Sequence, residues 1–236
     1  MRSFVKRFIP EKVLVFQRRL RNKYSIIFRN ILSGIPNVPA GTDWVGYETL
    51  IEFIRMNDIL SVKGDFVEIG TFLGGGARRL SKFIDNKKVP KKLFVIDIFD
   101  PTFDWTEDIS GRPMASLYLN TLKKYQGKSQ WEVFLNNTKG CRSLVVLKGD
   151  SKEIEIPTDN VCFGFIDGNH DPEYVENDFY LIWNKLTSKG VVAFHDFDFD
   201  LPQTTAKINE LVKKHYSSIQ ETFHDKNKHI LFVIKK

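Results

Sequence analysis

The feature that most constrains the fold is an alternation of short apolar runs with longer amphipathic stretches through most of the chain. The apolar runs are DFVEIG (65–70), KLFVIDIF (92–99), SLVVLKGD (143–150), VCFGFIDG (161–168) and GVVAFHD (190–196). Near-continuous apolar strands separated by helices indicate a parallel sheet that is covered on both faces.

The amphipathic stretches have the spacing of helices. They are residues 43–60, 74–84, 114–125, 131–138, 172–186 and 204–216. After them, SIQETFH (218–224) and HILFVIKK (229–236) flank the turn DKNK, which predicts an antiparallel hairpin. We therefore expect an α/β, Rossmann-like, doubly wound sheet of seven strands, mostly parallel with a C-terminal antiparallel hairpin and helices on both faces.

The net charge of +6 is unevenly distributed. Residues 1–30 hold nine Lys or Arg and one acid, which makes this segment +8 and leaves −2 for the rest. NVPAGT (37–42) has the composition of a linker. We expect a basic amphipathic N-terminal arm at residues 1–36 and a domain at residues 37–236.

Three roles are open for the arm. It packs as a helix on the domain or on a second subunit of a homo-oligomer, or residues 1–30 contact an anionic membrane or glycolipid. Nucleic acid is the least favoured partner, because no nucleic-acid motif accompanies the charge. No apolar run reaches the length of a membrane span or signal peptide. Two scattered cysteines, Cys141 and Cys162, favour a cytoplasmic location, with peripheral contact at the inner membrane face if the arm binds lipid.

Ligands of such sheets bind at the carboxyl ends of the strands. The first strand leads into VEIGTFLGGGA, whose glycines allow a cofactor to approach the backbone. Phe72 breaks the dinucleotide pattern G-x-G-x-x-G, and Glu68 suits a cationic ligand such as S-adenosylmethionine. The candidate cofactor contacts here are Glu68, Gly70, Thr71, Gly74 and Gly75. The alternative is an ordinary tight turn between strand and helix.

Acids also end the next two strands. Asp97 is placed to hold ribose hydroxyls, and its alternative role is that of a loop acid. Asp150 and Ser151 are placed to contact adenine, although Asp150 could equally cap the next helix.

The last two parallel strands end in FIDGNHD and FHDFDFD. Adjacent strands bring their terminal side chains together, and Mg²⁺ prefers one or two carboxylates with water or substrate oxygens. The predicted ligands are Asp167 and Asp196, with Asp198 as a weaker candidate. A hydrated acidic loop without metal is the alternative.

Taken together, five motifs resemble the class I S-adenosylmethionine-dependent methyltransferases, and more narrowly the macrocin O-methyltransferase-like group. They are GDFVEIGTFLGGGA (64–77), VIDIFD (95–100), GDS (149–151), FIDGNHDPEYVENDF (165–179) and GVVAFHDF (190–197). The resemblance covers about residues 44–235. It implies that Asp167 contacts the cofactor region and that Asp167, His195 and Asp196 hold Mg²⁺.

Two residues depart from the family pattern. Metal-dependent relatives often carry an acid at the position of His195, so a weakly metal-dependent or metal-free enzyme is the alternative here. They also often carry Asp at the position of Asn169, where it serves as the base. The catalytic base then falls to His170 or His195, both of which are able to accept a proton near neutral pH.

The predicted function is methyl transfer from S-adenosylmethionine to a hydroxyl of a small-molecule or glycan acceptor, a sugar or glycoconjugate, with assistance from Mg²⁺. Residues 100–114 form either a wall of the acceptor site or a disordered surface loop. A catalytically silent cofactor-fold scaffold is one alternative. A nicotinamide-dependent oxidoreductase is a weaker one, because the dinucleotide pattern fails at Phe72.

Overall fold

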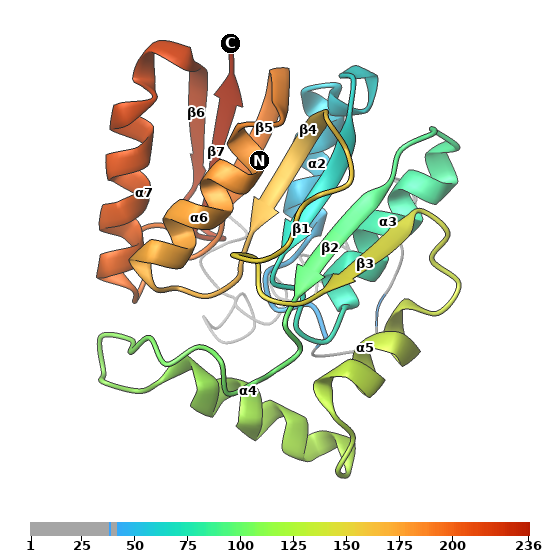
Figure 1. Ribbon diagram of the computed structural model, residues 1–236, viewed down its shortest axis with the longest axis vertical. Helices are drawn as coiled ribbons and strands as arrows, with labels where there is room; N and C mark the ends of the chain where they lie inside the picture. The colour runs from blue at the N-terminus through green and yellow to red at the C-terminus, as the bar shows by residue number, and fades with distance from the viewer. Residues whose placement is uncertain (1–37, 39–41) are drawn as a thin grey trace, which may run out of the picture. The chain divides into compact units, whose positions relative to one another are not determined.

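The computed structural model describes Val38 and residues 42–236, so the predicted arm and its contacts lie outside the described residues. Its centre is a seven-stranded sheet in the order β3-β2-β1-β4-β5-β7-β6 (Figure 1). The strands are β1 Asp65–Ile69, β2 Leu93–Asp97, β3 Leu144–Lys148, β4 Val161–Ile166, β5 Leu186–Phe194, β6 Ile219–Asp225 and β7 Ile230–Lys235. Strand β7 pairs antiparallel with β5 and β6, and the other pairs are parallel. The predicted fold class is confirmed.

Helices cover both faces of this sheet. They are α2 Glu48–Met56, α3 Gly75–Lys87, α4 Met114–Leu122, α5 Gln130–Thr138, α6 Pro172–Trp183 and α7 Pro202–Lys214. Figure 1 shows α6 and α7 in front of the sheet, α2 and α3 behind it, and α4 across the carboxyl ends of the parallel strands. Within the described part of the chain, no helix is long and apolar enough to cross a membrane.

Strand periodicity decides which β1 side chains face which helices. Val67 and Ile69 belong to a buried cluster with residues of α6 and α7, among them Phe179 and Leu211. Because successive strand residues point to opposite faces, Glu68 points toward the α2 side. Its carboxylate accepts a hydrogen bond there from the hydroxyl of Tyr47.

The register of the central strands aligns their carboxyl ends. Ile69 of β1 lies beside Ile96 of β2 and Ile166 of β4, and Ile166 lies beside Phe194 of β5. The residues that follow these four positions therefore meet at one edge of the sheet.

The predicted helix at residues 43–60 is longer than the observed one. Helix α2 begins at Glu48, because residues 42–47 form a turn in which an Asp43 oxygen accepts a hydrogen bond from the Gly46 amide at 2.8 Å. Strand β5 starts at Leu186, before the predicted run at 190–196. The remaining elements agree with the predicted ranges to within a few residues.

Replacement of Phe179 by Ala should strongly destabilise the domain. The ring is 2% exposed and stacks on Trp183 with a centroid distance of 5.0 Å. Loss of a buried phenyl group costs about 3–5 kcal/mol. Urea denaturation checks the value, with Tyr216→Ala as the control, because Tyr216 is 78% exposed. A loss below about 1 kcal/mol for Phe179→Ala would contradict the described packing.

Candidate active site

A cavity of about 300 Å³ lies along the carboxyl edge of the sheet. It is bounded by the strand ends, by the loop at residues 100–113 and by α4. The predicted site residues that line it are Gly70, Thr71, Asp97, Asp150, Ser151, Asp167, His170, His195 and Asp196. The structure therefore brings nine of the predicted residues to one cavity.

Gly74 and Gly75 were predicted to contact a cofactor, but the structure does not place them on the cavity wall. A side chain at Gly74 would collide with the Phe134 ring, and one at Gly75 with the Thr42 backbone. Both glycines are therefore explained by packing within the protein. Gly70 does line the cavity, with φ +81°, and a side chain added there would collide with the Asp167 carbonyl.

Asp97 holds the loop that follows β1. Its Oδ2 accepts hydrogen bonds from the backbone amides of Thr71 and Phe72, both at 2.9 Å. Its Oδ1 accepts from the Phe99 amide at 2.6 Å and from the Gln130 side chain at 3.2 Å. These four bonds occupy the acceptor sites of a carboxylate. Asp97 thus organises the glycine loop, and ribose binding by Asp97 remains a prediction.

Glu68 lies behind the cavity wall and is completely buried. Its Oε1 accepts a hydrogen bond from the Tyr47 hydroxyl at 3.0 Å, and Tyr47 itself lines the cavity. Its Oε2 makes no hydrogen bond of good geometry with the described residues. Burial raises the pKa of Glu68 to about 8, against the opposing effect of the Thr71 and Tyr47 hydroxyls. A carboxyl group with a pKa of about 8 is mostly protonated at neutral pH, so Glu68 offers no fixed negative charge in the free protein, and its contact with a cationic cofactor stays a prediction.

Asp150, which follows the third strand, accepts hydrogen bonds from other residues of the protein. Its Oδ1 accepts from the Lys152 amide at 2.9 Å, and its Oδ2 accepts from the Tyr174 hydroxyl at 2.8 Å. Ser151 accepts a long hydrogen bond, 3.4 Å, from the Asn177 side chain. Both residues line the cavity, so adenine contact is geometrically open to them.

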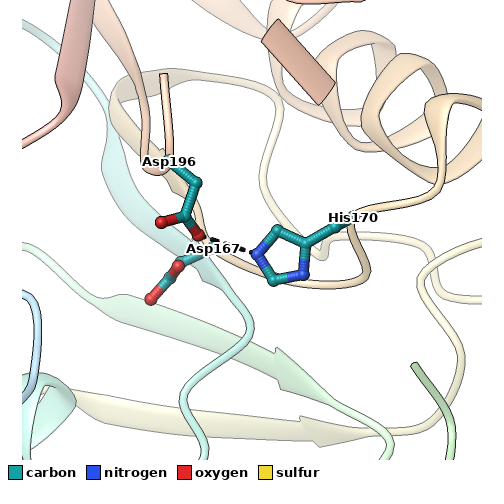
Figure 2. A group of neighbouring side chains, drawn as sticks. All are labelled: Asp167, His170 and Asp196. Carbon is teal, nitrogen blue, oxygen red and sulfur yellow. Dashed lines mark hydrogen bonds and ion pairs between the residues drawn. The ribbon is translucent and has the colours of Figure 1, made fainter. Parts of the chain in front are cut away.

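Asp167, His195 and Asp196 meet where β4 and β5 end. His195 Nδ1 lies 2.9 Å from Asp167 Oδ1 and 3.0 Å from Asp196 Oδ2, yet it makes no hydrogen bond of good geometry with the described residues. Figure 2 shows the carboxylates of Asp167 and Asp196 side by side. Neighbouring ligands of an octahedral Mg²⁺ with bonds of 2.1 Å lie about 3.0 Å apart. Carboxylate oxygens are the ligands that a hard divalent cation takes, and among the described residues Asp167, His170 and Asp196 offer possible ligand atoms that all lie within 4.8 Å of one another.

His170 lies between two carboxylates. Its Nδ1 is 2.6 Å from Asp104 Oδ2, and its Nε2 is 2.8 Å from Asp196 Oδ2, the contact drawn in Figure 2. Burial opposes a charge on this ring, but the hydrogen bonds to Asp104 and Asp196 outweigh it and raise the pKa to about 10. A doubly engaged imidazolium donates hydrogen bonds and has no lone pair for a metal or for a proton. Burial also opposes a charge on His195, but the charges of Asp167 and Asp196 outweigh it and raise the pKa of His195 well above its usual value. His195 differs from His170 in geometry, because the two carboxylates that contact it both lie at Nδ1.

Asp104 is a site residue that the sequence analysis did not single out. It belongs to the loop at residues 100–113, which is an ordered wall of the cavity. The loop is tied to the segment after β5 by the Ile109 amide, which donates to the Asp200 carbonyl at 3.0 Å. The available signal was the acidic and aromatic composition of residues 100–114, which could not indicate that Asp104 reaches His170.

The fold and this cavity define a class I S-adenosylmethionine-dependent methyltransferase. A family model described as a methyltransferase domain matches residues 67–197, more than half of the chain, and the chain belongs to that family. This confirms the predicted class of enzyme and rejects the nicotinamide-dependent oxidoreductase. No curated protein matches the chain.

Solved structures share the fold. The O-methyltransferase NovP superposes with a TM-score of 0.60 at 20% identity, over 80% of this chain and 78% of NovP. The calicheamicin methyltransferase CalS11 gives 0.55 at 16% identity, over 96% and 93%. A structure described as a putative caffeoyl-CoA O-methyltransferase from Staphylococcus aureus gives 0.51 at 14% identity, over 95% and 98%. At these identities the similarity shows the fold alone.

Replacement of Asp104 by Ala should destabilise the protein by about 3 kcal/mol or more. The substitution leaves a buried imidazolium with one of its two partners, and breaking a buried ion pair has a cost of this size. Urea denaturation measures the loss. Glu173→Gln is the control, because its ion pair with Lys152 is largely exposed and should contribute less than about 1 kcal/mol. Equal effects of the two substitutions would contradict the buried Asp104–His170 pair.

Glu68 should make the free protein less stable as pH rises from 5 to 8. The pKa of Glu68 is 4.5 when unperturbed and about 8 in the fold, so between these values the folded state binds the extra proton. Stability is then lost as pH rises, by at most about 1.4 kcal/mol per pH unit. Glu68→Gln carries no titrating group and should remove this slope. Parallel stability profiles of the two proteins in urea would contradict the raised pKa.

Proposed function

We propose that this protein transfers the methyl group of S-adenosylmethionine to a hydroxyl of a sugar or glycoconjugate, with assistance from Mg²⁺. The observation that carries the proposal is the cluster of Asp167, His195 and Asp196 in the same cavity as the glycine loop. Methyl transfer needs a cofactor site and a place where a hydroxyl oxygen loses its proton. This cavity offers both at adjacent strand ends.

On the cofactor side, the row of strand ends supplies the contacts. Gly70 and Thr71 would hold the methionine part, with the Glu68–Tyr47 pair behind them. The adenosine part would extend toward Asp97 and the β3 end, where Asp150 and Ser151 line the cavity.

On the acceptor side, Asp167 and Asp196 would hold the cation. When bound, Mg²⁺ would lower the pKa of the acceptor hydroxyl and orient it. A histidine that binds a metal through one nitrogen keeps its proton on the other, so His195 cannot be ligand and base at once. We assign His195 as the base, because both nitrogens of His170 are held by carboxylates.

A sugar acceptor is supported by the walls of the cavity and by one structural neighbour. CalS11 is described as a TDP-rhamnose 3'-O-methyltransferase, and it superposes over 96% of this chain with a TM-score of 0.53. Aromatic and polar side chains both line the cavity, including Phe103, Arg112 and Phe199. Such a surface offers both ring faces and hydrogen-bond partners to a saccharide.

A catalytically silent scaffold is the second candidate. Asn169 favours it, because the Asn169 amide cannot accept a proton as the usual Asp would. Its Oδ1 accepts a hydrogen bond from the Asp171 amide at 2.9 Å, a role in turn formation instead of catalysis. Cofactor binding without methyl transfer to any member of a broad panel of sugars, nucleotide sugars and phenols would favour the scaffold.

Thermal unfolding with cofactor and metal tests the proposal. S-Adenosylhomocysteine at roughly a hundred times its Kd should stabilise the protein by about 2.7 kcal/mol, a shift of roughly 5–10 °C. Mg²⁺ should add a further shift that EDTA removes. The double variant Asp167→Asn, Asp196→Asn should lose the Mg²⁺ shift and turnover but keep the S-adenosylhomocysteine shift.

Asp198→Asn is the matched control, because Asp198 is an exposed acid two residues from Asp196. It should behave as the wild type in all these measurements. An Mg²⁺ shift that survives in the double variant would contradict the metal site. Absence of any shift with S-adenosylhomocysteine would contradict the cofactor site.

A further inference from the structure

Three aromatic rings meet on the wall of the cavity. Phe72 follows the glycine loop, Trp44 belongs to the turn before α2, and Tyr118 comes from α4. The Phe72 centroid lies 4.9 Å from that of Trp44 and 5.0 Å from that of Tyr118. Trp44 and Tyr118 are parallel to within 9° at 6.5 Å. Three separate segments of the chain thus converge on one aromatic cluster, Trp44–Phe72–Tyr118.

The aromatic cluster lies beside the carboxyl end of the central strand β1. Phe72 is two residues beyond Gly70, which follows the central strand β1. Burial and then the charges of Asp104, Asp167, Asp196 and Asp97 raise the pKa of Tyr118, so its phenol is close to the carboxylates of the cavity. The Phe72 amide donates a hydrogen bond to Asp97, the last residue of β2, so the cluster lies beside the β1 and β2 ends of the cavity.

The backbone of Phe72 has an energetically unfavourable conformation, which fixes the position of its ring. Its φ is +48°, a region that non-glycine residues seldom adopt. The amides of Thr71 and Phe72 both donate to Asp97, which holds the backbone in this form. Strained residues persist where the surrounding structure over-determines them, and they concentrate at ligand sites.

We propose that Trp44, Phe72 and Tyr118 form an aromatic cage that binds the positively charged sulfonium of S-adenosylmethionine. This inference rests on the proposed function. In the row of strand ends, the sulfur joins the methionine part near β1 to the ribose part near β2, which is where the cluster stands. Aromatic faces carry negative electrostatic potential and attract cations.

The cage binds the cofactor and its product with different affinities, because only the cofactor carries a positive charge on sulfur. When the methyl group leaves, the electron pair of the broken carbon–sulfur bond stays on sulfur, and the sulfonium becomes a neutral thioether. The acceptor oxygen gains the methyl group and loses its proton to the base. The rings therefore attract S-adenosylmethionine and hold the departing S-adenosylhomocysteine less strongly.

Binding constants from titration calorimetry test the cage without turnover. The probes are S-adenosylmethionine, sinefungin, which carries an ammonium in place of the methylsulfonium, and S-adenosylhomocysteine. In Phe72→Leu, Trp44→Leu and Tyr118→Leu, the Kd of the two cationic ligands should rise about threefold to tenfold, the range of one cation–π contact. The Kd of S-adenosylhomocysteine should change less than about twofold.

Two control variants separate the ring effect from other causes. Tyr118→Phe keeps the ring and should leave the ratio of the Kd values near that of the wild type. Phe103→Leu removes another ring that lines the cavity but packs on Tyr174, at 5.4 Å, and should also leave the ratio unchanged. The nearby carboxylates are present in every variant, so a change in ratio reports the rings.

Equal weakening of charged and neutral ligands in the three Leu variants would overturn the cage while leaving the proposed function intact. Failure of the wild type to bind any of the three ligands would overturn both. Should Phe72→Leu fail to fold, Trp44→Leu decides the question, because Trp44 is 44% exposed and its replacement should leave the fold intact. A Trp44→Leu ratio equal to that of the wild type would then count against the cage.

Discussion

The constraint on which this site depends is the crowding of carboxylates at one edge of a sheet. The aligned parallel strands place Asp97 at the end of β2, Asp167 after β4 and Asp196 after β5, and Asp104 joins them from the loop. Each charge loses hydration there and needs a partner. Backbone amides satisfy Asp97, His170 satisfies Asp104 and Asp196, and His195 faces Asp167.

These pairings also hold the walls of the cavity together. His170 joins Asp104 of the loop to Asp196 after β5, so the loop at residues 100–113 is fastened to the end of the sheet by two buried ion pairs. Asp97 does the same for the glycine loop through the amides of Thr71 and Phe72. The same acids that create an anionic cavity therefore position the two loops that enclose it.

Acids at the ends of strands can be predicted from the sequence, because each one comes at the end of an apolar run or directly after it. The parallel topology then brings them together at one edge of the sheet. That reasoning places Asp97, Asp167 and Asp196 correctly on one edge. It could not reach Asp104, because a loop without periodicity gives no direction for its side chains. It also treated Gly74 and Gly75 as a cofactor cradle, since a glycine required by a neighbouring ring or backbone looks the same in sequence as one required by a ligand.

The charge balance of the proposed reaction follows from this arrangement. The cofactor brings one positive charge to the middle of the strand ends, and methyl transfer removes that charge from sulfur. The acceptor proton would supply an equal charge to the proposed base His195, whose Nδ1 lies within 3.0 Å of Asp167 and Asp196. The cavity therefore holds the same net charge before and after transfer, and the carboxylates stabilise the cation in both places. A preorganised anionic edge of this kind needs little rearrangement during the step.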